Sequence, residues 1–142
     1  MTEIPVKQKV LFICQQNSGR SQLAEALMGM LYGDRFEAYS AGVEPSRVNP
    51  FALQVLAQKG VDASALRAKS IEEFKDVEFD YVVTVCDRAK ENCPFFPGRH
   101  IIHHSFSRAL SEGSEQAILD SFVRVRDEIA DWLTVRFGAQ TN

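Results

Sequence analysis

The chain has 142 residues, of which 45% are hydrophobic and 25% charged, and its formal net charge is −3 at pH 7. This size and composition indicate a globular protein, and we expect residues 1–142 to form one domain with a core between about 9 and 137. The acidic balance argues against a general nucleic acid-binding surface, so an anion would have to be held locally. No apolar stretch approaches the roughly 20 residues that span a bilayer, and the segment MTEIPVKQKV lacks a hydrophobic signal core. We therefore expect a cytoplasmic protein that does not enter membranes.

Hydrophobic periodicity predicts four strands that alternate with three helices. The predicted strands cover 9–13, 36–42, 79–86 and 99–104, and the predicted helices cover 21–33, 49–60 and 114–137. Asn49 and Ser114 are the expected N-caps of the last two helices, because their side chains can accept hydrogen bonds from the first turn. Strands that alternate with helices favour a four-stranded parallel sheet covered on both faces. The expected fold class is therefore α/β, arranged as a three-layer sandwich.

The segment CQQNSGRS begins at Cys14, directly after the predicted strand 9–13, and leads into the helix that starts near Ser21. In open α/β sheets, ligands bind outside the carboxyl ends of the strands. A loop in that position can turn backbone N–H groups inward beside the positive end of the helix dipole, which favours a tetrahedral oxyanion. Gly19 would let the loop turn tightly, and Arg20 offers two donors to such an anion. The predicted oxyanion-binding residues are Gln15, Gln16, Asn17, Ser18, Gly19 and Arg20.

The same surroundings favour the thiolate form of Cys14, which we interpret as a nucleophile aimed at the anion. Ser21 is expected to donate a hydrogen bond to its sulfur. Asn17 is expected to hold the loop through side-chain bonds to its own backbone. The alternative is that Cys14 is a small, inert cysteine at the end of a buried strand.

The stretch VLFICQQNSGRSQLAEAL resembles the phosphate-binding loop of the low-molecular-weight protein tyrosine phosphatase fold. The phosphatases and the thioredoxin-coupled arsenate reductases share this fold. Three further stretches resemble the reductases more closely: YSAGVEPSRVNPFALQVLAQKGVD, FDYVVTVCDRAKENCPFFPG and SFVRVRDEI. The resemblance covers about residues 9 to 133, and it implies a fold like that of the phosphatases and the reduction of arsenate.

The reductases combine their nucleophile with two further cysteines seven positions apart, and Cys86 and Cys93 match this spacing. The resemblance implies that Cys14 attacks arsenate, that Cys86 attacks Cys14 as arsenite leaves, and that Cys93 then attacks Cys86. Thioredoxin would reduce the resulting disulfide, although glutaredoxin or another thiol carrier could also do so. If 86–93 were helical, the two cysteines would lie about 10 Å apart, whereas a disulfide needs Cα atoms within about 7 Å. We therefore expect 86–97 to be mobile.

Other interpretations of these cysteines stay open. Cys86 could be a small hydrophobic residue at the end of a strand, with Cys93 incidental. A zinc site is disfavoured, because the chain has no close cysteine pair of the kind that structural zinc sites use. We expect neither a metal nor a cofactor.

One expected catalytic group is missing. Both families usually carry an Asp-Pro pair on the loop after the fourth strand, where the aspartate protonates the leaving oxygen. Here the corresponding stretch offers Ser107 and Arg108 and no carboxylate, which predicts poor phosphatase turnover. Glu112 or Asp87 could substitute for the acid. Arg108 could add anion affinity at the mouth of the site, or it could be a solvated surface residue.

Some of these reductases hold a potassium ion beside the loop with an Asn, a Glu, a Ser and an Asp. Asn17, Glu25 and Ser40 match three of these positions, and Lys69 occupies the fourth. We expect the Lys69 ammonium to replace the cation and to pair with Glu25, so that activity does not depend on potassium. The alternative is an exposed lysine on a loop.

Three functions are compatible with these patterns. The first is a thioredoxin-dependent arsenate reductase that acts as a monomer on arsenate or a phosphate-like oxyanion. The second is a low-molecular-weight tyrosine phosphatase that works through a phosphocysteine at Cys14. The third is a non-enzymatic sensor of oxyanions or redox state.

Overall fold

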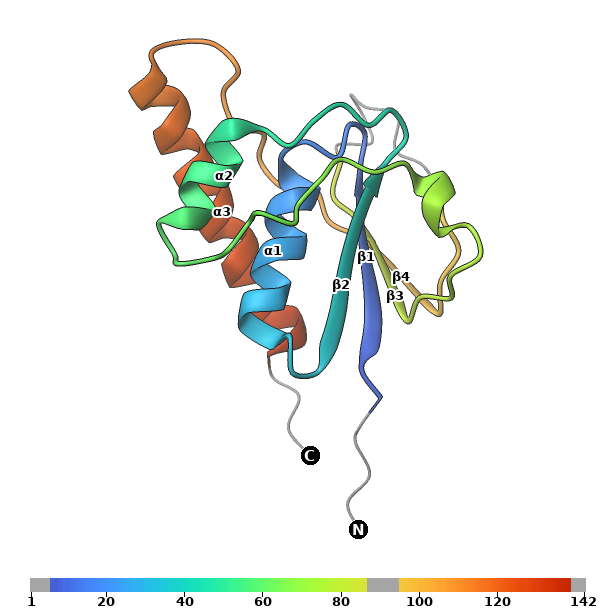
Figure 1. Cartoon of the computed structure of the whole chain (residues 1–142). Coiled ribbons are helices and arrows are strands. Elements are labelled where there is room, and N and C mark those ends of the chain that lie inside the picture. The colour runs from blue at the N-terminus through green and yellow to red at the C-terminus, as the bar shows by residue number, and fades with distance from the viewer. Residues whose placement is uncertain (1–5, 87–94, 139–142) are drawn as a thin grey trace.

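The structure, a computed structural model, describes residues 6–86 and 95–138 (Figure 1). Four parallel strands form one sheet in the order β2-β1-β3-β4. The strands are β1 (Gln8–Cys14), β2 (Phe36–Gly42), β3 (Tyr81–Thr84) and β4 (His100–His103). The helices are α1 (Arg20–Tyr32), α2 (Pro50–Ala57) and α3 (Glu115–Phe137), together with a 3-10 helix, η1 (Ile71–Phe74). The predicted α/β fold with a four-stranded parallel sheet is confirmed.

The two faces of the sheet are covered differently. Val10 and Phe12 point from β1 into a core shared with α1, α2 and α3, which gather on one side of the sheet (Figure 1). Leu11 and Ile13 point to the opposite face, where η1 and its flanking loops supply the cover. That second layer includes the buried Phe79, whose ring meets neighbouring aromatic rings edge to face at centroid distances of 5.6 to 5.9 Å. The η1 helix has only four residues, too few for a periodic pattern to predict it.

Both predicted helix caps are present. Asn49 Oδ1 accepts a hydrogen bond from Phe51 N at 2.8 Å, and Ser114 Oγ accepts one from Ala117 N at 3.1 Å. These bonds satisfy backbone donors that have no partner within the helix. The positions of α2 and α3 could therefore be predicted from local sequence.

The β3 strand is shorter than the predicted 79–86. At its start, the Asp80 carboxylate accepts a hydrogen bond from Lys9 N at 2.9 Å, so a side chain takes a donor that the strand ladder would otherwise use. At its end, Val85 N still donates a 2.9 Å hydrogen bond to Ile13 O, but β1 itself ends one residue later, at Cys14. The β4 strand likewise covers His100–His103 within the predicted 99–104.

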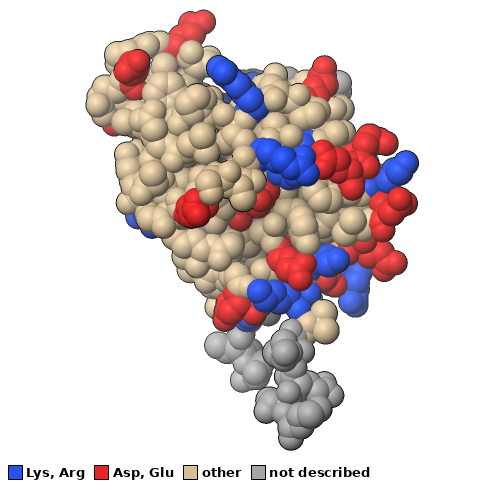
Figure 2. Space-filling view, viewed as in Figure 1, with Lys and Arg blue, Asp and Glu red and all other residues tan. Residues whose placement is uncertain are grey.

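Acidic and basic side chains are interspersed on the face of the molecule that Figure 2 shows. Within residues 6–86 and 95–138, no helix has both the length and the apolar character needed to cross a membrane.

Candidate active site

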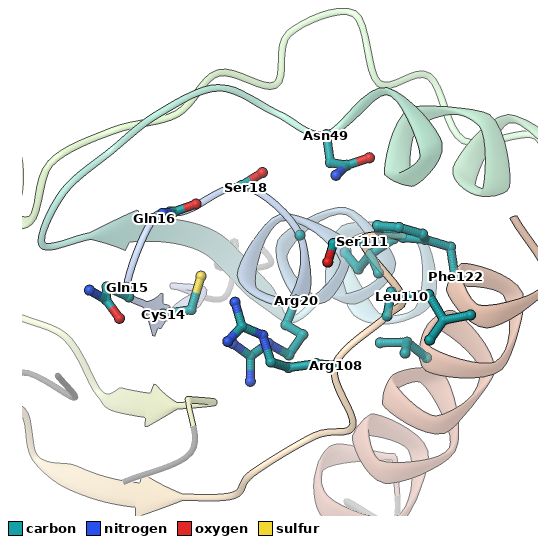
Figure 3. A pocket seen from close by; sticks show the side chains of 14 residues that line it. Cys14, Gln15, Gln16, Ser18, Arg20, Asn49, Arg108, Leu110, Ser111 and Phe122 are labelled. Carbon is teal, nitrogen blue, oxygen red and sulfur yellow. The ribbon is translucent and has the colours of Figure 1, made fainter. Parts of the chain in front are cut away.

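A pocket of about 230 Å³ opens where β1 turns into α1, at the carboxyl end of the sheet (Figure 3). Cys14 is the last residue of β1 and Arg20 is the first of α1, so five residues form the loop between them. The described residues that line the pocket are Cys14, Gln15, Gln16, Ser18, Gly19, Arg20, Leu23, Asn49, Arg108, Ala109, Leu110, Ser111, Phe122 and Val125. The pocket therefore combines the predicted loop with a second segment, 108–111, that leads into α3.

The peptide groups of the loop are held by the neighbouring segment 44–49. The carbonyl of Gln15 accepts a 2.9 Å hydrogen bond from Glu44 N, and that of Gln16 accepts one of 3.1 Å from Ser46 N. The carbonyl of Ser18 accepts a 3.0 Å hydrogen bond from Asn49 N. Across a trans peptide, a carbonyl and the N–H that follows it point in opposite directions, and the described residues include no cis peptide bond. The N–H groups after these three carbonyls therefore point away from 44–49, and two of them belong to Gln16 and Gly19, which line the pocket. Backbone N–H groups in such a loop can donate to an anion.

Gly42, the last residue of β2, allows the loop to approach this closely. A Cβ atom on Gly42 would lie 2.7 Å from Gln15 O and 2.8 Å from Asn17 N, well inside normal contact distance. The sequence indicated Gly42 only as the end of a strand. Its role as a neighbour of the loop depends on the pairing of Cys14 with Gly42 across β1 and β2.

Ser21 connects the Cys14 sulfur to Asn17. Ser21 Oγ lies 2.8 Å from Cys14 Sγ and accepts a 2.8 Å hydrogen bond from Asn17 Nδ2. Because Asn17 supplies the donor in that bond, the Ser21 hydroxyl hydrogen is available to the sulfur. All three residues are buried. A donor in this position, together with the positive N-terminal end of α1, stabilises negative charge on the sulfur.

The sharp turn of the loop is at Asn17. Its φ of 52° lies in the left-handed region, whereas Gly19, at φ −117° and ψ −86°, has a negative φ but lies outside the main helical and strand regions. A Cβ atom on Gly19 would have only an ordinary contact, 3.9 Å from Phe122 Cε1. The left-handed residue of the loop is therefore Asn17, where asparagine serves because it tolerates this conformation better than most residues. Gly19 is a second position with an unusual backbone conformation.

The partners of the Asn17 side chain also differ from those expected. Its Oδ1 accepts hydrogen bonds of 2.8 Å from Lys69 N and from Gln22 Nε2, so it binds remote groups rather than the backbone of its own loop. Asn17 is fully buried behind the loop and is not among the described residues that line the pocket. Its side chain therefore positions the loop and Ser21, and any contribution to anion binding must come from its backbone.

Gln22 is a site residue that sequence reasoning missed. It is fully buried, and its Nε2 lies 2.8 Å from Asn17 Oδ1, 3.0 Å from Asn17 O and 2.8 Å from Arg67 O. Gln22 therefore fixes the amide that orients Ser21 and ties the loop to the segment before η1. The one available signal was a glutamine in the first turn of a helix, next to apolar positions that face the core.

Replacing Gln22 by methionine is expected to slow the alkylation of Cys14 by iodoacetamide about tenfold, because Asn17 loses the donor that fixes its amide. The rate is measured by mass spectrometry on the peptide that contains Cys14. A Leu56→Ala variant in α2 serves as a control for stability, because it should cost about 2–5 kcal/mol of unfolding free energy without touching the loop. Equal alkylation rates in wild type and Gln22→Met, or the same slowing in Leu56→Ala, would contradict the assignment.

Lys69, Glu25 and Ser40 form a cluster behind the loop. Lys69 Nζ lies 3.4 Å from Glu25 Oε1 and donates a 2.7 Å hydrogen bond to Arg67 O. Glu25 Oε1 also accepts a hydrogen bond from Ser40 Oγ at 2.5 Å. The Lys69 side chain is only 9% exposed, so the expected ion pair is present and the lysine is not an exposed loop residue.

Arg67, whose carbonyl serves both Gln22 and Lys69, is itself held by its side chain. Its guanidinium donates hydrogen bonds of 3.1 and 2.8 Å to the two carboxylate oxygens of Glu73. These hydrogen bonds and the positive charge of Arg67 lower the pKa of the Glu73 carboxyl. The segment behind the loop is therefore anchored to η1 at neutral pH.

Arg20 is almost fully buried at the start of α1. Its Nη1 donates a 3.3 Å hydrogen bond to Val85 O, just beyond the end of β3. Arg20 lines the pocket together with Cys14, so its guanidinium and the sulfur face the same space. This geometry suits a tetrahedral anion held by the guanidinium over the sulfur.

The described pocket lining contains no carboxylate. Ser107 precedes the lining segment, and Arg108 contributes its side chain to the pocket in place of an acid. Glu112 is exposed and is not among the described lining residues. Asp87 lies outside the described part of the chain. None of the described residues that line the pocket is therefore a substitute for the missing aspartate; the Glu128 carboxylate accepts a 3.4 Å hydrogen bond from Ser107 N but is not among the lining residues.

Cys86 lies two residues beyond β3 and is fully buried. Its sulfur is disulfide-bonded, whereas Cys14 is a free thiol. Cys93 falls within 87–94, outside the described residues, and so does most of the segment 86–97 whose mobility was predicted. In the described residues, no three His, Cys, Asp or Glu side chains are grouped as a metal site would require.

Comparison with known proteins identifies the family. Residues 9–131 match the model of the low molecular weight phosphotyrosine protein phosphatases. The arsenate reductase of Halalkalibacterium halodurans is 37% identical over 125 residues, which cover 87% of this chain and 90% of that protein. A solved arsenate reductase in the phosphate-binding state has a TM-score of 0.76 at 27% identity, covering 94% of this chain and 99% of the other.

A thioredoxin-dependent arsenate reductase from Corynebacterium glutamicum has a TM-score of 0.64 at 28% identity, covering 93% of this chain and 63% of that one. The similarity therefore extends over nearly the whole chain, in sequence and in structure. The chain belongs to the low molecular weight phosphotyrosine protein phosphatase family and, within it, to the arsenate reductases.

Proposed function

We propose that this protein reduces arsenate to arsenite with electrons supplied by its own cysteines. One observation carries the proposal: a buried free thiol, Cys14, ends β1 beneath the anion loop, while Cys86, just beyond the neighbouring strand β3, is disulfide-bonded. A phosphatase needs only the first of these cysteines. Reduction of As(V) to As(III) needs two electrons, and the oxidation of two thiolates to one disulfide supplies them.

The chemistry runs in three steps. The Cys14 thiolate attacks arsenic, and one arsenate oxygen leaves as water after taking up protons. The Cys86 thiolate then attacks Cys14 Sγ; the S–As bond breaks, its electron pair stays on arsenic, and arsenite departs. Cys93 attacks Cys86 in turn, which releases the Cys14 thiolate and leaves a Cys86–Cys93 disulfide. Each exchange needs an accessible sulfur in its thiolate form.

Within this scheme, the loop residues have distinct roles. Arg20 and the inward N–H groups of the loop bind the arsenate oxygens, and Ser21 stabilises the thiolate before it attacks. Asn17, Glu25, Ser40 and Lys69 support the loop from behind. Gln15, Gln16, Ser18 and Gly19 contribute through their backbone.

The lack of a carboxylate in the described lining favours arsenate over a phosphate ester. An alkoxide or phenolate leaving from phosphorus needs a proton from a positioned acid. An oxygen leaving arsenate as water or hydroxide can take its proton from solvent. Phosphotyrosine phosphatase activity through a Cys14 phosphocysteine is therefore the weaker candidate.

The test is arsenate-dependent NADPH oxidation in the presence of thioredoxin and thioredoxin reductase, with an aryl phosphate assayed in parallel. We expect turnover of arsenate and little hydrolysis of the ester. Hydrolysis of the ester without arsenate turnover would identify a phosphatase. Tight phosphate binding without turnover of either compound would identify a sensor.

Thioredoxin is the proposed reductant, in keeping with the thioredoxin-dependent relative from Corynebacterium glutamicum. The same assay with glutaredoxin, glutathione and glutathione reductase distinguishes the two electron donors. We further propose that the protein acts as a monomer in the cytoplasm, where thiol carriers are kept reduced.

We expect activity to be the same in potassium and in sodium buffers, because the buried Lys69 ammonium already supplies a cation to Glu25. Lys69→Met should lower the free energy of unfolding by about 1–2 kcal/mol, since it leaves the partly buried Glu25 carboxylate without its charged partner, with only the hydrogen bond from Ser40. Thermal unfolding and turnover are measured in both salts, with the exposed Lys59→Met as control. A potassium-dependent rate in the wild type would contradict the proposed role of Lys69.

A further inference from the structure

We propose that Arg108 is a second anion-binding residue of the pocket and that it restricts the substrate to a free inorganic oxyanion that carries no organic substituent. This inference rests on the proposed function, because it specifies the substrate class of the same site. Three observations support it: the loop that carries Arg108 is anchored to the core, the described pocket lining has no carboxylate, and the Arg108 side chain extends toward the site.

The loop before α3 is anchored on both sides of Arg108. On one side, Phe106 is buried, with its ring centroid 4.7 Å from that of His104 and 5.6 Å from that of Trp132. On the other side, Leu110 N donates a 2.9 Å hydrogen bond to Ser121 Oγ in α3. Arg108 therefore extends from a short segment whose two ends are fixed to the core.

The hydroxyl that anchors the second side is itself positioned. Ser121 is buried, and its Oγ donates a 2.6 Å hydrogen bond to Ile118 O within α3. With its hydrogen used in this way, Oγ presents a lone pair to Leu110 N. The residue after Arg108, Ala109, packs against the core that the three helices share. These contacts hold Arg108 at the mouth of the pocket.

Arg108 and Arg20 approach the pocket from different elements. Both side chains line it, and Figure 3 shows both extending toward the side where Cys14 lies. No ion pair engages the Arg108 guanidinium within the described residues, whereas Arg67, Arg99 and Arg126 each have a carboxylate partner. The described lining of the pocket thus contains two arginines and no carboxylate, although the chain as a whole is acidic.

The position of Arg108 determines what the pocket accepts. An anion bound by Arg20 and the loop over Cys14 directs its remaining oxygen toward the mouth, where a phosphate ester would carry its organic group. A guanidinium there can donate hydrogen bonds to that oxygen, but it keeps its proton at neutral pH and cannot act as a general acid. Arg108 therefore favours a free tetrahedral oxyanion and gives no assistance to an alkoxide or phenolate leaving group.

Binding of inorganic phosphate tests the first part without any turnover. We expect Arg108→Gln to weaken phosphate binding, measured by calorimetry, about tenfold, and Arg108→Lys to weaken it less, since lysine keeps the charge but loses the planar fork. Arg124→Gln, an exposed arginine on α3 that does not line the pocket, removes the same charge and should change affinity less than twofold. Equal affinities in wild type and Arg108→Gln, or equal losses in the two Gln variants, would overturn the proposal.

Ester hydrolysis tests the second part. Ser107→Asp/Arg108→Pro restores the acid and removes the guanidinium, so it should hydrolyse an aryl phosphate at least about tenfold faster than the wild type. Unfolding midpoints show whether the variants are folded. If ester hydrolysis by a folded double variant does not increase, the restriction to inorganic oxyanions is wrong. If the wild type binds phosphate through Arg108 but does not reduce arsenate, the proposed function fails while the binding role of Arg108 stands.

Discussion

A Cys14→Ser variant is expected to lose arsenate-dependent turnover by at least about 10³-fold, because serine is not ionised at neutral pH and cannot form the bond to arsenic. The loop should stay folded, since Cys14 makes one side-chain hydrogen bond, to Ser21, and serine can also make one. Calorimetric binding of phosphate checks that the site is intact. The loss should therefore appear in kcat rather than in anion affinity.

Variants of the other two cysteines are expected to stop the reaction at different steps. With pre-reduced protein and no thioredoxin, Cys86→Ser should release no arsenite, because nothing attacks Cys14 in the arsenate adduct. Cys93→Ser should release up to one arsenite per protein and then stop, with Cys14 and Cys86 joined in a disulfide. Arsenite is measured in a single-turnover experiment, and the disulfide is mapped by mass spectrometry.

Two results would contradict the cysteine relay. The first is sustained arsenate turnover in Cys93→Ser at the wild-type rate with thioredoxin present. The second is release of arsenite by Cys86→Ser in amounts equal to those from Cys93→Ser. The first result would mean that thioredoxin reduces the Cys14–Cys86 disulfide directly and that Cys93 is dispensable. The second would mean that a thiol other than Cys86 attacks Cys14 in the arsenate adduct.

Arg20→Lys is expected to lower kcat/KM for arsenate by about 10²–10³-fold even though the positive charge is kept. Lysine cannot offer two parallel N–H groups to two anion oxygens. Removing one positioned donor from a reacting anion typically lowers the rate by a factor of this size. The buried guanidinium also contacts Val85 O, so the substitution weakens a link between α1 and the end of β3.

An Arg124→Lys variant is the matched control for Arg20→Lys, because it makes the same exchange on the exposed side of α3. Steady-state kinetics and phosphate binding are compared in both variants, and unfolding midpoints show whether they are folded. A change of less than threefold in kcat/KM for a folded Arg20→Lys would contradict the assignment of Arg20 as the main anion ligand.

The elements that define this fold could be predicted from sequence because their signals are local. Hydrophobic periodicity located all four strands and the three long helices, and the caps at Asn49 and Ser114 depend on bonds within a few residues. The position of Cys14 between a buried strand and a helix likewise follows from consecutive residues. The cysteine spacing and the missing aspartate could be identified by resemblance to the reductases.

The tertiary structure decided how these parts support one another, because the contacts that do so join residues far apart in the chain. Gln22 reaches Arg67, Asn17 binds Lys69, and the loop carbonyls bind segment 44–49. Local sequence indicated Gly19 alone as a turning position, whereas the folded loop also has a left-handed residue at Asn17, whose side chain binds the remote Lys69.

The direction of Arg108 likewise depends on packing. The sequence left two possibilities for it, a surface residue or an anion ligand. In the structure Arg108 is exposed and also lines the pocket, on a loop attached to an aromatic cluster at Phe106 and to α3 at Ser121; its role as an anion ligand is the proposal made above. The sequence alone thus predicted the fold class and the family, and it indicated Cys14 as the candidate nucleophile. Only the folded chain brings Asn17, Ser21 and Cys14 into contact and places Arg20 and Arg108 around one pocket, because these positions depend on distances between segments that no local pattern encodes.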